Sequence, residues 1–248
     1  MELGGKHILV TGASSGIGRV IAQFISNEGG RVTLLARNKE RLEAVFHSLN
    51  GDSHSFTCCD LNDNEKMQDT ISQIDNVDGV VFCAGINEFI PIKFIKQEKI
   101  NSIFQTNYFS QISLIRTLLK KKKINKGASL VFISSISSLM GVPGTLLYSA
   151  SKAAVNSTVK VLAVELSGQK IRANAICPGI VRTPMLGSTN ISEEQFLEQV
   201  QNHAKSQIPL GSFGNPEDVA EAAVFHLSDK SKWLTGNIMI LDGGFSLQ

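Results

Sequence analysis

The sequence predicts an α/β fold with three layers, in which a mostly or wholly parallel seven-stranded sheet is covered by helices on both faces. The main observation is that short, β-branched apolar runs alternate with longer amphipathic stretches along the whole chain. The second is composition, because 248 residues of which 42% are hydrophobic can bury one sizeable core. No linker or internal repeat divides the chain, so we expect residues 1–248 to form a single domain.

Each predicted element follows from its own local pattern. Apolar runs predict strands at residues 7–10, 31–36, 55–58, 79–83, 129–133, 172–176 and 237–241. Amphipathic stretches predict helices at residues 17–27, 39–49, 64–74, 97–122, 148–166, 193–205 and 216–227. The last helix begins with Pro216 directly after Asn215, which is a favourable helix start. Residues 184–209 interrupt the rhythm after a strand, so we expect them to form a substrate lid.

Charge and hydropathy argue against several classes of protein. A formal net charge of +2 is too small for a surface that neutralises nucleic acid. No apolar run approaches the roughly 18 residues of a membrane span. The first residues enter a strand without a cleavable leader, and the four cysteines lack C-x-x-C spacing. We therefore expect a cytoplasmic protein with reduced, packed thiols and no metal site.

A glycine-rich turn joins the first predicted strand to the first helix. Strand, glycine turn and helix in this order direct free backbone N–H groups and the positive end of a helix at a phosphate. A turn that binds no ligand is the alternative, and a P-loop is not predicted because no Gly-Lys-Ser/Thr follows. The predicted dinucleotide contacts in the turn are Gly12, Ser14, Ser15, Gly16, Ile17 and Gly18.

The end of the second predicted strand indicates which dinucleotide is bound. Ala36 stands where an acidic residue would hold the adenosine ribose hydroxyls, and Arg37 follows it. A cation without a neighbouring carboxylate favours a 2′-phosphate, so we expect NADP(H) rather than NAD(H) unless Arg37 is only a solvated loop cation. Asp60 and Leu61 follow the third strand and are expected at the adenine, although helix capping is an alternative role for Asp60.

A serine, a tyrosine and a lysine suggest acid–base chemistry. Tyr148 and Lys152 are four residues apart and therefore share one helical face, while Ser135 follows a buried strand. An ammonium beside a phenol favours the phenolate, so Lys152 is expected to lower the pKa of Tyr148 and let it exchange a proton with a carbinol oxygen. Ser135 is expected to hold the substrate oxygen. The structural alternative is a surface helix on which Tyr148 and Lys152 are an ordinary pair of residues four positions apart.

Together these motifs resemble those of the short-chain dehydrogenase/reductase family, in the same order and at its spacing. The matching segments are the turn at residues 11–18, Ser135, Tyr148-Ser-Ala-Ser-Lys152, Cys177-Pro178-Gly179 and Asp242-Gly243-Gly244, which extend over essentially the whole chain. The resemblance implies a Rossmann-type fold and hydride transfer between a nicotinamide and a carbonyl or carbinol carbon, with Tyr148 as proton donor. It also implies that Lys152 hydrogen-bonds the nicotinamide ribose and that Asn107 shapes a proton relay through water. A cap or kink in the long helix is a role compatible with that relay.

The resemblance implies further cofactor contacts. Backbone contact with the adenosine ribose is expected from Ala84 and Gly85. The segment that includes Pro178 and Gly179 is expected to line the nicotinamide, with Ile180 or Val181 at the carboxamide and Thr183 at the pyrophosphate; helix-start packing is the alternative. The family's Asn-Asn-Ala-Gly motif is here Phe82-Cys83-Ala84-Gly85, so the two amides that help tie this strand to its neighbours are missing.

The substrate is less well determined. Within the family the chain most resembles 3-oxoacyl-acyl-carrier-protein reductases, which implies a carrier-linked carbonyl substrate. A small ketone, a steroid or a polyol is the alternative, and a non-catalytic dinucleotide-binding sensor is the alternative from another class. An apolar pocket above the nicotinamide is expected from Leu139, Met140, Val142, Leu147, Met185, Leu186, Ile191, Phe196 and Leu197.

Two expectations concern partners. Lys120-Lys121-Lys122-Lys123 and Lys126 form a cationic cluster, which either docks an acidic carrier protein or is a solvated helix end. The resemblance also implies a homo-oligomer, a tetramer or a dimer, formed through the helices at residues 97–122 and 148–166 and through the last strand.

Overall fold

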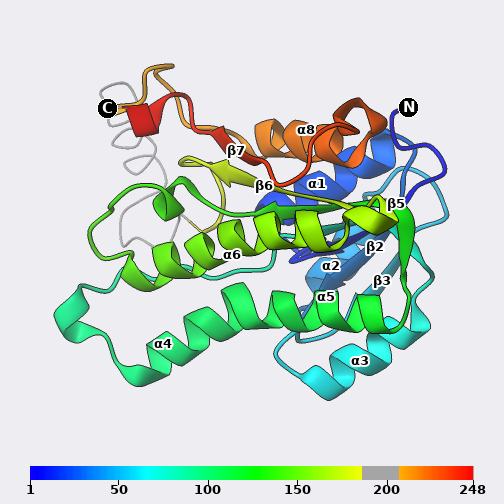
Figure 1. Ribbon diagram of the computed structural model, residues 1–248, viewed down its shortest axis with the longest axis horizontal. Coiled ribbons are helices and arrows are strands. Elements are labelled where there is room, and N and C mark those ends of the chain that lie inside the picture. Colours follow the sequence, from blue (N-terminus) through cyan, green and yellow to red (C-terminus); the bar gives the residue numbers. More distant parts are fainter. Residues whose placement is uncertain (186–206, 248) are drawn as a thin grey trace.

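The computed structural model describes residues 1–185 and 207–247, and its centre is one parallel sheet. The strands are β1 (His7–Thr11), β2 (Arg31–Ala36), β3 (Ser55–Cys58), β4 (Val77–Phe82), β5 (Ile124–Ile133), β6 (Arg172–Pro178) and β7 (Ile238–Leu241). Their order across the sheet is β3-β2-β1-β4-β5-β6-β7, and every neighbouring pair is parallel (Figure 1). The predicted Rossmann-type, three-layer α/β/α fold with seven parallel strands is confirmed.

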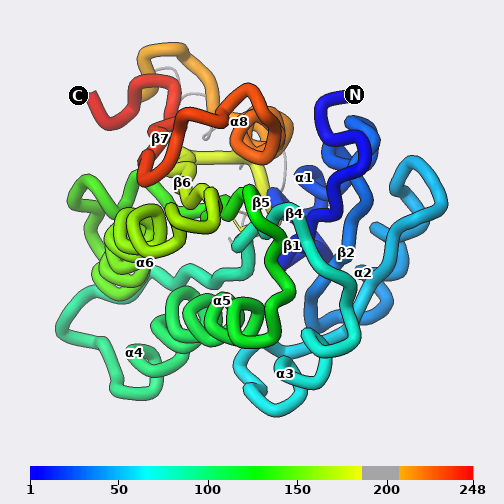
Figure 2. The backbone as a smooth tube through the Cα atoms, turned by 45° about the vertical axis from the view of Figure 1, so that its right-hand side comes forward, coloured from blue at the N-terminus to red at the C-terminus, as the bar shows by residue number. Residues whose placement is uncertain are grey.

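Helices cover both faces of the sheet (Figure 2). On one face lie α1 (Gly16–Asn27), α2 (Lys39–Phe46) and α8 (Pro216–Leu227). On the other lie α3 (Asn64–Gln73), α5 (Ser110–Lys120) and α6 (Leu146–Glu165), with α4 (Gln97–Phe104) leading into α5. Each face has its own buried apolar cluster, so the central strands are apolar on both sides, as their continuous hydrophobic runs require.

Helix starts follow local capping chemistry. The Asn38 side chain accepts a hydrogen bond from the Arg41 N–H at the start of α2, and Asp63 accepts one from the Lys66 N–H at the start of α3. At α8, Pro216 occupies the first turn and the Asp218 carboxylate accepts the Asn215 N–H at 2.7 Å. These caps place the helix starts where the sequence predicts them.

Two predicted elements differ in detail. The helix expected at residues 97–122 is divided by a π-helical turn at Gln105–Phe109, between α4 and α5. β5 begins at Ile124 rather than residue 129, because its polar first half continues the pairing with β4 across an irregularity in register. The predicted helix at residues 193–205 and most of the predicted lid at 184–209 lie outside the described residues.

The strand order identifies where a ligand can bind. The chain proceeds outward from β1 to β2 and β3, and then returns to place β4 on the other side of β1. This reversal opens a crevice at the carboxyl ends of β1 and β4, where open α/β sheets bind ligands. Among the residues that the structure describes, no helix has both the length and the apolar character needed to cross a bilayer.

Candidate active site

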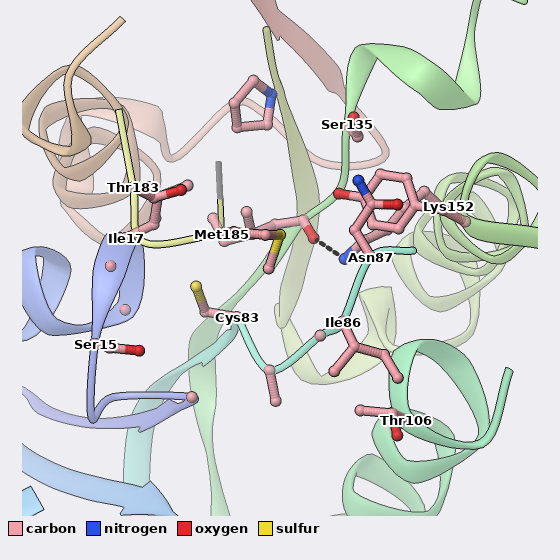
Figure 3. A pocket seen from close by; sticks show the side chains of 18 of the residues that line it. Ser15, Ile17, Cys83, Ile86, Asn87, Thr106, Ser135, Lys152, Thr183 and Met185 are labelled. Atoms are coloured by element: carbon pink, nitrogen blue, oxygen red, sulfur yellow. Dashed lines mark hydrogen bonds between the residues drawn. The ribbon is translucent and has the colours of Figure 1, made fainter. Parts of the chain in front are cut away.

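A cleft of about 1080 Å³ lies at the carboxyl edge of the sheet. It is larger than a drug-sized ligand needs and therefore has room for an extended cofactor together with a substrate. Figure 3 shows Ser15, Ile17 and Thr183 on one side of it and Ser135 and Lys152 on the other. The predicted residues that line the cleft are Gly12, Ser14, Ser15, Gly16, Ile17, Gly18, Arg37, Asp60, Leu61, Ala84, Gly85, Ser135, Tyr148, Lys152, Pro178, Gly179, Val181 and Thr183.

The glycine turn has the geometry of a phosphate cradle. Gly12 has φ +64°, and a Cβ there would lie 2.9 Å from the Ala84 backbone, while a Cβ on Gly18 would overlap the Gly12 carbonyl oxygen. α1 begins after Ser15 without a side-chain cap or an acidic residue in its first turn, so its first N–H groups remain available to an anion. The residues present therefore fit the pyrophosphate of a dinucleotide.

The adenosine end of the cleft carries an ion pair. Arg37 Nη1 lies 3.8 Å from Asp60 Oδ2, and both side chains are substantially exposed. The other oxygen of Asp60 accepts the Asn62 N–H at 2.9 Å, whereas the cap of α3 is Asp63. The alternative in which Asp60 caps a helix is therefore wrong. Ala36, at the end of β2, supplies no carboxylate to this end of the cleft.

The predicted Ser–Tyr–Lys group comes together between β5 and α6. Tyr148 and Lys152 lie one helical turn apart in α6, and the Lys152 Nζ lies 5.8 Å from the centre of the Tyr148 ring. Lys152 is only 4% exposed, and its ammonium donates a 2.8 Å hydrogen bond to the Ile133 carbonyl at the end of β5. Ser135 follows Ile133 by two residues, at the carboxyl end of β5. Ser135, Tyr148 and Lys152 therefore line the same cleft.

Burial sets the protonation of this group differently from the sequence prediction. Burial raises the pKa of Tyr148 to about 12, and a hydrogen bond from Ser135 opposes that rise. Burial also lowers the pKa of the Lys152 ammonium to about 8. The prediction that Lys152 lowers the pKa of Tyr148 is wrong for the protein alone, because burial raises this pKa, Ser135 supplies the opposing effect, and the Lys152 ammonium is directed at the Ile133 carbonyl. At neutral pH Tyr148 is a phenol that can donate a proton, which suits carbonyl reduction.

Asn107 lies behind the cleft rather than in its wall. It is fully buried in the π-helical turn, its Oδ1 accepts the Ile86 N–H at 2.8 Å, and its Nδ2 donates to the Ile86 carbonyl at 2.9 Å and to Ser151 Oγ at 3.1 Å. It thereby ties the loop after β4 to α6. A Cβ on Gly85 would lie 3.3 Å from Asn107 Oδ1 and 3.4 Å from Lys152 Nζ, so both residues stand directly behind that glycine. The proton-relay role of Asn107 stays a prediction.

The segment after β6 extends along the cleft to the glycine turn. Gly179 donates its N–H to the Leu241 carbonyl at 2.9 Å, and a Cβ there would lie 2.8 Å from Asp242 Cβ. A Cβ on Gly16 would lie 3.8 Å from Thr183, which places Thr183 against the phosphate cradle. This position fits the pyrophosphate contact predicted for Thr183.

Several residues that line the cleft were not predicted from the sequence, and some residues that were predicted to line it do not. The missed ones include Asn38, Arg41, Asn62, Asn87, Phe89, Thr106 and Phe245. Arg41 lies in the first turn of α2, four residues after Arg37, and this spacing in the sequence could have indicated it. Phe245 is near the end of the chain, and no local pattern in the sequence indicates it. Of the expected apolar residues, Met185 and Val142 line the cleft, and Leu139, Met140 and Leu147 do not. Leu186, Ile191, Phe196 and Leu197 lie outside the described residues.

The lysine cluster lies far from the cleft of its own chain. Lys120 ends α5 and Lys126 lies early in β5, which is at the amino edge of the sheet. Ser135 lies beyond the other end of β5, past the five regularly paired residues Ser129–Ile133, which span about 17 Å. Lys123 Nζ donates to the Ile74 carbonyl at 2.6 Å and so has a structural contact. A carrier bound to this cluster would face the edge of the sheet opposite the cleft.

Comparison with known proteins agrees with this geometry. A family model described as enoyl-(acyl carrier protein) reductase matches residues 12–246, and the chain belongs to this family of short-chain dehydrogenases/reductases. These are oxidoreductases that act on carbonyl or alcohol groups with a nicotinamide dinucleotide.

Individual relatives resemble the chain over nearly its whole length. The 3-oxoacyl-acyl-carrier-protein reductase FabG of Rickettsia bellii is 31% identical and covers 98% of both chains. Carbonyl reductase family member 4 of Danio rerio is 33% identical over 96% of this chain and 97% of its own. A short-chain dehydrogenase family protein from Francisella tularensis superposes with a TM-score of 0.85 at 29% identity, covering 98% of this chain and 99% of its own.

Proposed function

We propose that this protein is an NADP(H)-dependent reductase that transfers hydride from the nicotinamide to a carbonyl carbon, with a 3-oxoacyl group on an acyl carrier as substrate. The observation that carries the proposal is that one cleft joins a glycine phosphate cradle to a half-buried phenol, a buried ammonium and a buried serine hydroxyl. Tyr148 and Lys152 are both present, which argues against a non-catalytic dinucleotide sensor.

The preference for NADP(H) rests on charge at the adenosine end. Arg37 and Arg41 both line the cleft, and Ala36 supplies no carboxylate at the end of β2 to repel a 2′-phosphate or to hold the ribose hydroxyls. Asp60 partly neutralises Arg37 across 3.8 Å, and Arg41 supplies a second cation. We therefore assign the 2′-phosphate to Arg37 and Arg41.

The chain's own residues supply the proton and the orientation of the substrate. Bound nicotinamide supplies the hydride. The protonated Tyr148 would give its proton to the carbonyl oxygen, which the Ser135 hydroxyl would hold in place. The buried Lys152 ammonium, already bonded to Ile133, has further N–H donors for a ribose hydroxyl. Asn107 would keep the loop after β4 at the cofactor.

The substrate assignment is supported by relatives and by the cleft lining. The relative from Rickettsia bellii is named for a 3-oxoacyl-acyl-carrier-protein substrate, and Phe89, Val142 and Met185 give this cleft an apolar side. The relative from Danio rerio is named as a carbonyl reductase, which makes a small apolar ketone the second candidate. The lysine cluster lies at the edge of the sheet opposite the cleft. The structure of a single chain therefore gives no support for docking of a carrier protein at these lysines.

The test is steady-state kinetics with NADPH and NADH against a panel that holds a 3-oxoacyl thioester, carrier-linked and free, and small ketones. We expect turnover with NADPH at a kcat/KM at least 10-fold above that with NADH. We expect Arg37→Ala to lower this ratio and Arg116→Ala, an exposed change on α5, to leave it unchanged. Equal use of NADH would contradict the cofactor assignment, and loss of turnover with Tyr148→Phe is required for the proton-donor assignment.

We further propose a cytoplasmic homo-oligomer, a tetramer or a dimer. α5, α6 and β7 are the elements that the family resemblance assigns to contacts between subunits. Val161 and Val164 on α6 and Ile240 on β7 are apolar and about half exposed or more, which supports the proposal. Light scattering in solution should give a mass of two or four chains; the mass of one chain would contradict it.

A further inference from the structure

A buried polar connection runs from α6 to the Ser135 turn. Asn156 lies one helical turn after Lys152 and two turns after Tyr148, on the same face of α6, and is 7% exposed. Its Nδ2 donates a 2.8 Å hydrogen bond to Ser138 Oγ. The Ser138 hydroxyl in turn donates to the Ser135 carbonyl at 2.5 Å. The helix that carries the acid–base pair is therefore bonded directly to the backbone of Ser135.

The direction of these hydrogen bonds follows from the groups involved. An amide nitrogen can only donate, so Ser138 Oγ accepts from Asn156 and keeps its own proton for Ser135. The Cys177 thiol, on β6, contacts the Asn156 amide at 3.7 Å and can donate to its Oδ1. With the amide reversed, its oxygen would compete with the Ser135 carbonyl for the Ser138 proton. The Cys177 sulfur lies 3.7 Å from both Oδ1 and Nδ2 of Asn156 and can contact either atom. It is therefore the Ser138 proton, bonded to the Ser135 carbonyl, that sets the orientation of the amide.

Other hydrogen bonds hold the residue before the Ser135 turn, where Ser134 donates its N–H to the Ile176 carbonyl at 2.7 Å and its hydroxyl to the Lys152 carbonyl at 3.2 Å. Ile136–Ser138 is a single 3₁₀ turn, held by the Ser138 N–H to the Ser135 carbonyl at 3.1 Å. The Ser135 hydroxyl accepts the Ser137 N–H at 3.2 Å and also bonds to Tyr148. Moving the turn would therefore move the Ser135 hydroxyl relative to Tyr148, because Ser135 begins the turn whereas Tyr148 lies on α6.

We infer that Asn156 and Ser138 are positioning residues, which hold the Ser135 hydroxyl at the substrate oxygen by bonding its carbonyl to α6. The inference rests on the proposed function. It predicts effects on kcat rather than on cofactor binding, because neither side chain lines the cleft. A misplacement of about 1 Å in a catalytic group can lower a rate by up to about 100-fold.

The test compares four variants by kcat and by KM for NADPH. Ser138→Ala and Asn156→Leu should each lower kcat by about 10-fold and leave KM for NADPH within twofold. Ser138→Thr keeps the hydroxyl and should retain at least half of the wild-type kcat. Ser167→Ala removes a hydroxyl that donates to the Val164 carbonyl beyond the far end of α6, and it should change neither constant.

Two further measurements separate positioning from general loss of structure. When Ser135 is already alanine, adding Ser138→Ala should change the residual kcat less than twofold, because Ser138 acts through the Ser135 hydroxyl. Hydrogen exchange of the backbone at residues 134–139, without cofactor or substrate, should accelerate in Ser138→Ala and Asn156→Leu and not in Ser167→Ala.

The outcomes distinguish this inference from the proposed function. If the wild-type protein reduces no carbonyl of the panel, the proposed function fails, and the exchange measurement alone decides whether Asn156 and Ser138 hold the turn. If the wild-type protein is active and Ser138→Ala keeps kcat within twofold, the inference is wrong and the proposed function stands. A loss that Ser138→Thr fails to restore, or that persists equally in the Ser135→Ala background, also overturns it.

Discussion

Burial decides how single residues in the candidate site are charged. Tyr148 is partly and Lys152 almost fully removed from water, so each is driven toward its neutral form, and the pKa of Tyr148 rises while that of Lys152 falls. Cys83, between them and the glycine turn, has its pKa raised to about 11 for the same reason. At neutral pH the site therefore presents a phenol, a thiol and an ammonium.

The pKa of Lys152 predicts a pH dependence of cofactor binding. Lys152 is charged below its pKa of about 8 and neutral above it, so NADPH affinity should fall as pH rises through about 8. Fluorescence titrations of NADPH between pH 6 and 9.5 measure this. Lys152→Met should bind weakly without the step near pH 8, whereas Lys160→Met, exposed two turns later in α6, should keep it. A wild-type affinity that is flat across this range would contradict the assignment.

His226 predicts a pH dependence of stability. The ring is fully buried, neither ring nitrogen has a partner in the described structure, and burial lowers the pKa of His226 to about 4. The unfolded chain binds this proton near pH 6.5 and the folded chain only near 4, so the free energy of unfolding decreases as pH falls between these values. The full loss is about 3 kcal/mol.

Urea denaturation at several pH values between 4 and 7.5 tests this prediction. The free energy of unfolding should decline less with acid in His226→Leu than in the wild-type protein, and the two curves should run parallel above pH 7. The exposed variant His47→Gln should follow the wild type. If His226→Leu shows the same acid slope as the wild type, the buried histidine does not have the lowered pKa.

At the scale of elements, the junction of β1 and α1 is the most constrained part of the fold. Gly12 combines a left-handed φ of +64° with a close approach to the Ala84 backbone after β4, so the turn is packed against the neighbouring strand end. The N-terminus of α1 depends on this packing for its direction. The phosphate cradle and the contact between β1 and β4 are therefore one structure.

Gly12→Ala should damage both stability and cofactor binding. Its Cβ would lie 2.9 Å from Ala84, and the left-handed conformation adds about 1–2 kcal/mol for any residue with a Cβ. We expect at least about 2 kcal/mol lower free energy of unfolding and at least 10-fold weaker NADPH binding. Gly141→Ala, where no atom lies within 4 Å, is the control and should be near neutral. Wild-type affinity in Gly12→Ala would contradict the cradle.

The element prediction succeeded where a pattern is local. The capped starts of α2 and α3, the Pro216 start of α8 and the apolar core of each strand all lie in runs of a few residues. The π-helical turn between α4 and α5 was missed, because nothing in the local periodicity of residues 97–122 marks it. Its cause is tertiary: Asn107 hydrogen-bonds Ile86 and Ser151, from two other segments.

At the scale of the whole molecule, the sheet carries a separate apolar cluster on each face, and the cleft opens at its carboxyl edge. The cleft is lined by the ends of β1, β2, β4, β5 and β6 and by the residues that follow them. A dinucleotide bound across these ends would connect both halves of the sheet. Binding should therefore stabilise the fold as a unit.

NADPH should raise the melting temperature of the protein. At 100 times its Kd, a ligand that binds only the folded state contributes about 2.7 kcal/mol, which corresponds to about 5–10 °C for a chain of this size. NADH at the same concentration should give a smaller shift, and Gly12→Ala, which binds at least 10-fold more weakly, should give at most about half of the wild-type shift. Differential scanning calorimetry measures all three. Equal shifts with NADH and NADPH would contradict the role of Arg37 and Arg41.

The sequence by itself determined the class of fold, the glycine turn, Ser135 with Tyr148 and Lys152, and the cation after β2. Each of these follows from hydrophobic periodicity or from the spacing of residues within fewer than about twenty positions of the chain. Over such short distances the pattern depends mainly on neighbouring residues in the sequence. Only the tertiary structure decided that Asn107 stands behind the cleft, that Phe245 reaches it, that desolvation raises the pKa of Tyr148, and that Asn156 is bonded through Ser138 to Ser135. Burial and hydrogen-bond partners depend on segments far apart in the chain, so they exist only once the strands and helices have packed.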